Sequence, residues 1–269
     1  MKTCLNQATL LTADLETFVT VAGAAKFDAI ELRTEKVQEA LKGKGKAEVS
    51  KLIHSSGLEV ASLNALEDFS IDERQSAKMM DQAEEMMRIC GVIGSKTIVA
   101  ISAPMLPNTK EHDVVQRTKA SLERLVQLGS EYGVNICFEF LGFKSRSIRA
   151  LEESWCMLRE TALSQVDLVI DTFHFYVGGS SLDSLQDIPA ERISIVHIND
   201  VERKPRDELR DGDRVLPGEG VMNLGSLVDR LKAKGYAGPL SVELFREDYW
   251  KQDPLSVARK ARQSLNRFL

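Results

Sequence analysis

Short apolar runs alternate along the chain with longer segments whose apolar residues repeat at helical spacing. In residues 113–132, for example, Val114, Leu122 and Leu125 fall on one face of a helix and charged residues on the other. Apolar runs rich in β-branched and aliphatic residues are predicted as strands at 3–6, 29–32, 60–63, 97–101, 135–140, 168–171, 193–198 and 240–244. The pattern therefore predicts a regular succession of strand and helix.

Glycine follows many of the helical segments shortly before the next strand begins. Gly23, Gly57, Gly133 and Gly235 all occupy this position. Because glycine adopts positive φ at little cost, we expect these residues to end their helices.

The alternation of strand and helix predicts parallel strands joined by helical crossovers. The chain has 269 residues, close to the roughly 250 residues of a typical (β/α)8 barrel. No linker divides it, and the polar segment 202–220 is expected to form a long loop. We therefore expect an α/β fold with a single TIM-barrel domain over residues 1–269.

Composition narrows the partners and the compartment. The net charge is −5 and the pI about 5.6, so the chain lacks the basic excess that nucleic acid binding requires, and we expect no nucleic acid partner. Neither a signal peptide nor a membrane-spanning segment is visible, so we expect a cytoplasmic protein without a membrane partner. Cys4, Cys90, Cys137 and Cys156 are scattered and are expected to be reduced. The sequence leaves the oligomeric state open, a homo-oligomer included.

Four successive predicted strands end in a polar, metal-ligating side chain. Glu139, Asp171, His197 and Glu243 occupy these strand ends. In a parallel barrel the carboxyl ends of the strands form the rim that carries the active site. The spacing therefore predicts that three carboxylates and one imidazole lie close together.

Three carboxylates in a partly dry site repel one another unless a cation lies among them. Oxygen-rich ligation with one imidazole suits a divalent ion in a site with open positions. We expect one catalytic metal ion, with Zn²⁺ or Mn²⁺ favoured and Co²⁺ or Mg²⁺ as alternatives.

The sequence resembles the xylose-isomerase-like TIM-barrel superfamily of sugar isomerases and epimerases, and within it the inosose isomerases. The resemblance spans nearly the whole chain and is carried by MKTCLNQAT, AIELRT, SLNAL, FEFLG, DTFHF, VHINDVE, DRVLPGEG and SVELFREDYWK. The superfamily's metal ligands fall on Glu139, Asp171, His197 and Glu243. The resemblance thus implies the same ligand set as the strand-end pattern.

Further residues are candidates for substrate binding. By resemblance, His174 in DTFHF contacts a substrate oxygen, and Arg214 in DRVLPGEG reaches a substrate hydroxyl or carbonyl. Asn64 and Glu31, which end predicted strands, are candidates for the pocket lining. His54 and His112 fall in helical segments and receive no chemical role.

The resemblance implies an isomerase of a small keto-polyol. Its reaction would shift the carbonyl of 2-keto-myo-inositol to the adjacent carbon, giving 1-keto-D-chiro-inositol, through a metal-stabilised cis-enediolate. Glu139 and Glu243 would be the catalytic acid and base, and which of them acts first is left open.

Three alternatives compete with this interpretation. A ketose 3-epimerase of the same superfamily would use the same metal and glutamates on open-chain sugars. An endonuclease IV-like repair enzyme needs several more histidines than the four present. A non-catalytic sugar-binding barrel would not need both glutamates.

Overall fold

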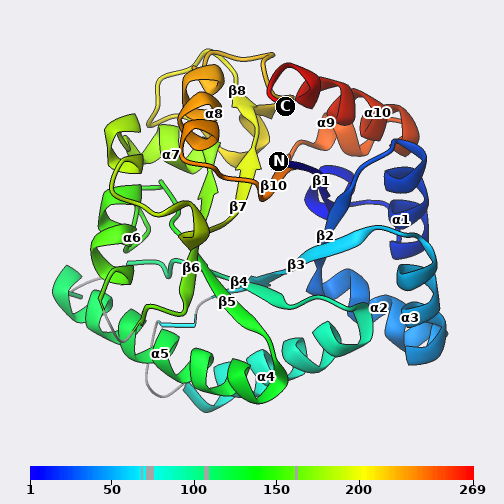
Figure 1. The fold of residues 1–269 in the computed structure, drawn as a ribbon, viewed down its shortest axis with the longest axis horizontal. Coiled ribbons are helices and arrows are strands. Elements are labelled where there is room, and N and C mark those ends of the chain that lie inside the picture. The colour runs from blue at the N-terminus through cyan, green and yellow to red at the C-terminus, as the bar shows by residue number, and fades with distance from the viewer. Residues whose placement is uncertain (68, 71–75, 106–108, 161–162) are drawn as a thin grey trace.

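The computed structural model describes residues 1–67, 69–70, 76–105, 109–160 and 163–269. Within them, eight parallel strands close into a barrel in the order β1-β10-β7-β6-β5-β4-β3-β2 (Figure 1). The strands are β1 (Lys2–Asn6), β2 (Ala29–Arg33), β3 (Glu59–Leu66), β4 (Thr97–Ile101), β5 (Asn135–Glu139), β6 (Val166–Asp171), β7 (Ile193–Ile198) and β10 (Pro239–Val242). The predicted TIM barrel and its eight strands are confirmed.

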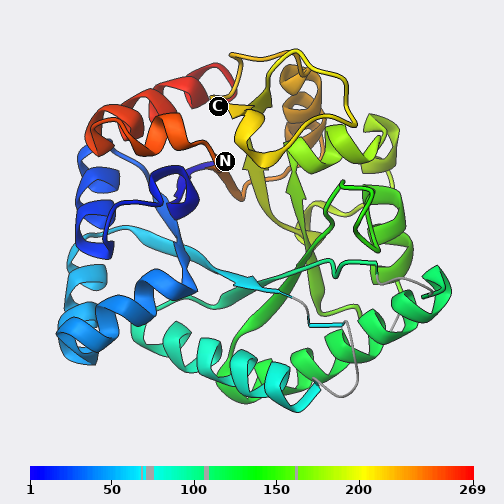
Figure 2. The same cartoon turned by 180° about the vertical axis from the view of Figure 1, so that it is seen from behind.

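Helices form a ring outside the strands, and the view from behind shows the same arrangement (Figures 1 and 2). They are α1 (Leu15–Ala24), α2 (Thr34–Lys44), α3 (Lys46–Ser55), α4 (Ser76–Ile93), α5 (Glu111–Tyr132), α6 (Leu151–Leu158), α7 (Thr172–Gly178), α8 (Leu224–Ala233), α9 (Glu247–Trp250) and α10 (Pro254–Ser264). None of the helices among the described residues is long and apolar enough to cross a membrane.

The expected glycine caps hold in three of four cases. Gly57, Gly133 and Gly235 adopt positive φ just beyond their helices. The prediction for Gly23 is wrong, because α1 continues through it and Lys26 takes the positive φ of 62° instead.

Part of the predicted loop 202–220 is more ordered than expected. After β7 the chain forms a two-residue strand β8 (Asp200–Val201), which pairs antiparallel with β9 (Arg214–Val215). This ribbon fixes Arg214 at the end of the long loop.

Alternate residues of each barrel strand face two different cores. Ile136, Phe138, Leu168 and Ile170 pack outward beneath the helices. Cys137, Val169 and Ile195 instead fill the barrel interior together with Val99 and Ile101. The next inward position on each strand therefore lies at the rim, directly above an apolar floor.

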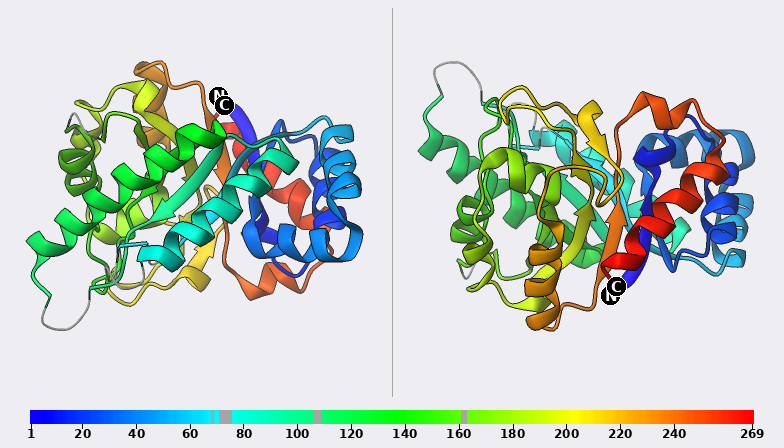
Figure 3. Two further views of the ribbon diagram at one scale, coloured as in Figure 1. Left: turned by 90° about the horizontal axis from the view of Figure 1, so that it is seen from below. Right: turned by 90° about the horizontal axis from the view of Figure 1, so that it is seen from above.

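All four cysteines are free, as expected, and three of them are buried. The two ends of the chain lie side by side in every view (Figures 1 and 3). β1 pairs with β10 to close the barrel, and the last helix, α10, contacts β1.

Candidate metal centre

The four predicted metal ligands lie together because each occupies a strand position whose side chain faces the barrel interior. Glu139 follows Cys137 on β5, Asp171 follows Val169 on β6, and His197 follows Ile195 on β7, each two residues further along its strand. Glu243 comes directly after β10, two residues beyond the buried Ser241. Each ligand thus occupies the last inward position above the floor.

The ligand atoms of these four residues lie within 4.8 Å of one another. His197 Nδ1 is 3.1 Å from Glu139 Oε1, 3.4 Å from Glu243 Oε2 and 3.8 Å from Asp171 Oδ2. All four side chains are buried. Three carboxylates and one imidazole at this spacing are a donor set that fits a divalent cation.

The site's charges perturb one another strongly. Burial, together with the negative charges of Glu139 and Asp171, raises the pKa of Glu243 to about 8 against the opposing effect of His197 and Arg214. Burial would lower the pKa of His197, but the surrounding Glu243, Glu31 and Glu139 raise it well above its ordinary value. The carboxylates therefore favour a positive charge at their centre.

Glu31 lies behind His197, on the side away from the other carboxylates. Its side chain is fully buried, and its two oxygens are 3.1 and 3.2 Å from His197 Nε2. Ser62 Oγ, Asn64 Nδ2 and Asn6 Nδ2 also donate to this carboxylate. Although burial alone would raise the pKa of Glu31, the charge and hydrogen bond of His197, together with Ser62, lower it to about 2. Glu31 is thus an anion that orients the imidazole of His197.

Arg214 lies beside the ligands as a fully buried cation. Its Nη1 donates to Asp171 Oδ2 at 2.5 Å and to Glu243 Oε2 at 3.0 Å, and its Nη2 to Asp211 Oδ1 at 2.9 Å. The rings of Phe173 and Phe245 lie 4.6 and 5.2 Å from its guanidinium carbon. Arg214 is therefore held at the site by two metal ligands and Asp211.

His174 adjoins Arg214 at the start of α7. Its Nε2 is 3.2 Å from Arg214 Nη2, and its backbone N–H donates to Asp171 Oδ1. The Nδ1 atom is buried and has no hydrogen-bond partner among the described residues. Burial lowers the pKa of His174, so the ring is neutral near pH 7. Because the guanidinium of Arg214 can only donate, Nε2 accepts from it, and the proton of the ring lies on Nδ1, which can donate to a ligand.

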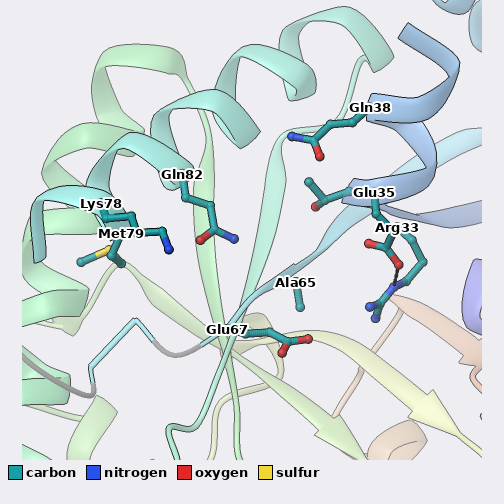
Figure 4. Close-up of a pocket in the computed structure, with 9 residues that line it drawn as sticks. Arg33, Glu35, Gln38, Ala65, Glu67, Lys78, Met79 and Gln82 are labelled. Carbon is teal, nitrogen blue, oxygen red and sulfur yellow. Dashed lines mark hydrogen bonds and ion pairs between the residues drawn. The ribbon is translucent and has the colours of Figure 1, made fainter. Parts of the chain in front are cut away.

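A cavity of about 190 Å³ opens over the centre. Glu139, Glu243, His174, Arg214 and Asn64 all border it, as predicted for a site that admits a small polar molecule. Glu31 is not among its lining residues and lies beneath it. A second cavity, of about 350 Å³, adjoins it, and Arg33, Ala65 and Glu67 border both (Figure 4).

Three polar residues at this centre were not predicted from the sequence. Asn6 donates to both Glu31 and Glu243, and Asn199 donates to Asp171. Asp211 binds the guanidinium of Arg214 through two nitrogens. Asn6 ends the first strand and Asn199 follows β7, so the strand-end criterion that selected the metal ligands could also have found both.

Comparisons with known proteins agree with this fold. The family model described as "Xylose isomerase-like TIM barrel" matches residues 19–268. Inosose isomerase of Bacillus velezensis is 31% identical over 98% of this chain and 95% of that protein, and the enzyme of Bacillus licheniformis is 32% identical over 98% and 96%. A solved structure of IOLI protein with a bound zinc atom is 29% identical, has a TM-score of 0.95, and is matched over 100% of this chain and 99% of that one.

More distant matches include an enzyme with a different name. Inosose dehydratase of Geobacillus thermodenitrificans is 29% identical over 53% of this chain and 50% of that protein. These matches cover less of the chain than the inosose isomerases do. The chain therefore belongs to the xylose isomerase-like TIM barrel family and, within it, to the inosose isomerases and their relatives.

Proposed function

We propose that this protein is a metal-dependent isomerase that moves the carbonyl of 2-keto-myo-inositol to the adjacent carbon, giving 1-keto-D-chiro-inositol. The observation that carries this proposal is the placement of Glu139 and Glu243, which border one small cavity and both approach His197 Nδ1. A carbonyl shift needs one proton removed from a carbon and another delivered to its neighbour, so two carboxyl groups on one cavity suit it.

Glu139, Asp171, His197 and Glu243 would hold the ion, with Zn²⁺ or Mn²⁺ favoured. When bound, it supplies Lewis-acid stabilisation of the negative charge that forms on the substrate oxygens. The relatives named inosose isomerase, and the zinc in the solved IOLI protein, support both the substrate and the ion.

The remaining side chains orient the substrate. One glutamate takes the proton from the hydroxyl-bearing carbon next to the ketone, which leaves an enediolate, and the other glutamate delivers a proton to the former carbonyl carbon. The hydroxyl proton passes to the former carbonyl oxygen, so the carbonyl and the hydroxyl exchange places. Arg214 places a buried positive charge at the cavity wall, which would stabilise negative charge on a substrate oxygen, and the unpartnered Nδ1 of His174 offers a direct contact. Asn64 at the cavity wall would bind a ring hydroxyl.

We further propose that the barrel is the chain's one domain and that it acts in the cytoplasm.

Proton NMR of the metal-loaded protein in D₂O tests this function. We expect deuterium to enter 2-keto-myo-inositol and a second ketoinositol to form. Fructose and tagatose run in parallel, and exchange with those ketoses alone would identify an epimerase of open-chain sugars instead. Glu243→Gln should abolish exchange, whereas Glu247→Gln, at an exposed position on α9, should leave it unchanged.

A further inference from the structure

A third cavity, of about 600 Å³, lies next to the candidate metal centre, and the side chains that line it carry a net positive charge. It is formed by the segment after β5 and by the long loop between β8 and β9. Phe143 and Asp211 border both this cavity and the one over the metal ligands. A molecule bound here is therefore adjacent to the reaction site.

Cationic side chains dominate this third cavity. Lys144, Arg149, Arg206 and Arg210 line it, against the two carboxylates of Asp207 and Asp211. The second cavity, which Figure 4 shows, is by contrast lined by equal numbers of cations and anions, namely Arg33 and Lys78 with Glu35 and Glu67. A local excess of two positive charges stands out in a chain whose net charge is −5.

Both carboxylates of the third cavity already have cationic partners. Asp207 lies 3.8 Å from Lys144, and Asp211 is bound by the buried Arg214. Arg149, Arg206 and Arg210, by contrast, form no ion pair among the described residues. The three guanidinium groups are thus left for an anion that the chain itself does not supply.

Contacts with neighbouring groups hold two of these arginines in place. Arg206 stacks on the ring of Tyr176 at 4.4 Å, and Arg210 Nη1 donates to the carbonyls of Asp207 and Leu209. Arg149 Nε is buried and has no acceptor among the described residues. A buried guanidinium N–H without an acceptor is costly, and a ligand oxygen would satisfy it.

We propose that Arg149, Arg206 and Arg210 form a binding site for a phosphate monoester group. Such a group carries about −1.5 to −2 charges at pH 7 and three strong acceptor oxygens, which matches the local charge excess better than a single carboxylate does. Guanidinium groups bind it through paired hydrogen bonds. The phosphate belongs either to a substrate that extends into the metal cavity or to a separate ligand.

Isothermal titration of inorganic phosphate into the metal-loaded protein tests the site directly. Arg149→Gln should weaken phosphate binding about tenfold or more, because it removes a charge-assisted contact, and the triple variant R149Q/R206Q/R210Q should weaken it further. Arg203→Gln, an exposed residue of the same loop that does not line the cavity, is the matched control. Circular dichroism establishes that each variant is folded.

Equal phosphate binding by the wild type and the triple variant would overturn the proposal, since it would place the anion at the metal ion or elsewhere. The titration needs no turnover, so it stands even if the protein fails to isomerise 2-keto-myo-inositol.

Kinetics then distinguish the two sources of phosphate. If the substrate carries it, a phosphorylated ketoinositol should have a KM about tenfold below that of the neutral ketone in the wild type and an equal KM in the triple variant. If KM does not differ in the wild type, while the triple variant still loses phosphate binding, the phosphate belongs to a separate ligand.

Discussion

The imidazole of His197 lies between Glu31 on one side and the carboxylates of the candidate metal centre on the other. Glu31 determines the orientation of the ring. Glu31 accepts from Nε2, so the lone pair of Nδ1, once that nitrogen is deprotonated, is directed to the point among Glu139, Asp171 and Glu243 where a cation would bind. Removing the negative charge of Glu31 would loosen the ring without touching any ligand.

Glu31→Gln should therefore lower metal affinity about 10–100-fold while the barrel stays folded. Competition with a chromogenic chelator measures the dissociation constant for Zn²⁺, and circular dichroism reports the fold. Glu35→Gln, on the exposed start of α2, is the control. Wild-type affinity in Glu31→Gln would show that the charge of Glu31 has no influence on the metal.

Asp28 gives a prediction for acid stability far from the metal. The backbone N–H of Thr3, and then its hydroxyl, donate to Asp28 Oδ2 and lower the pKa of that carboxyl below its ordinary 3.8. A lowered pKa in the folded state stabilises the protein above pH 3.8, and this contribution disappears as the pH falls through the folded-state pKa.

Asp28→Asn should accordingly lower Tm at pH 7 and have a smaller effect at pH 3. Thermal unfolding at both values, with the exposed Asp187→Asn as the charge control, measures the difference. An Asp28→Asn effect that is the same at both values would contradict the assigned cause.

Sequence alone predicted that Glu139, Asp171, His197 and Glu243 lie together, because each ends an apolar run, which is a local feature. It could not predict the contacts of Glu31. The strand-end criterion placed that residue in the pocket lining, but its partners His197, Ser62 and Asn6 come from three other strands, and only the closed barrel brings them together.

At the scale of elements, two glycines let the segment after β5 pack against α7. A Cβ on Gly142 would lie 2.5 Å from Gly178 N and 2.6 Å from His174 O, closer than side-chain atoms approach backbone. This contact sets the position of His174, and of Phe143 at the cavity wall.

Gly142→Ala should therefore lower the free energy of unfolding by about 1–3 kcal/mol through overpacking. Urea denaturation measures it. Gly91→Ala, inside α4 with nothing within 4 Å of the added Cβ, should instead raise stability by about 0.5–1 kcal/mol. Equal effects of the two substitutions would argue against a tight backbone contact at Gly142.

The elements themselves were predictable where periodicity is long enough to read. The barrel strands are buried apolar runs and were found, whereas the two-residue strands β8 and β9 are too short to show a pattern. The prediction that Gly23 ends its helix was wrong because the chain turns back over α1 three residues later, where Phe27 is buried. The N–H of Phe27 donates to Ala22 O, and Lys26 is the residue of this turn that has positive φ.

For the molecule as a whole, a metal ion held by Glu139, Asp171, His197 and Glu243 would couple binding to folding. The four ligands come from β5, β6, β7 and the end of β10, so the unfolded chain has no comparable site. An ion at 100 times its dissociation constant should stabilise the fold by about 2.7 kcal/mol.

Scanning calorimetry with and without Zn²⁺ should therefore show a higher Tm for the loaded protein, reversed by a chelator. Asp171→Asn should abolish most of this increase. An equal increase in Asp171→Asn and wild type would mean that the ion binds elsewhere.

Because β1 pairs with β10 and closes the barrel, the fold does not depend on the position of the chain ends. Because the two ends lie side by side (Figure 3), a short glycine-rich linker could join Leu269 to Met1, with new ends opened between Lys44 and Gly45 in the turn from α2 to α3. Every strand would keep both neighbours. We expect this circular permutant to fold and to bind Zn²⁺ like the wild type, and failure to do so would show that the order of synthesis, rather than the closed sheet, determines the fold.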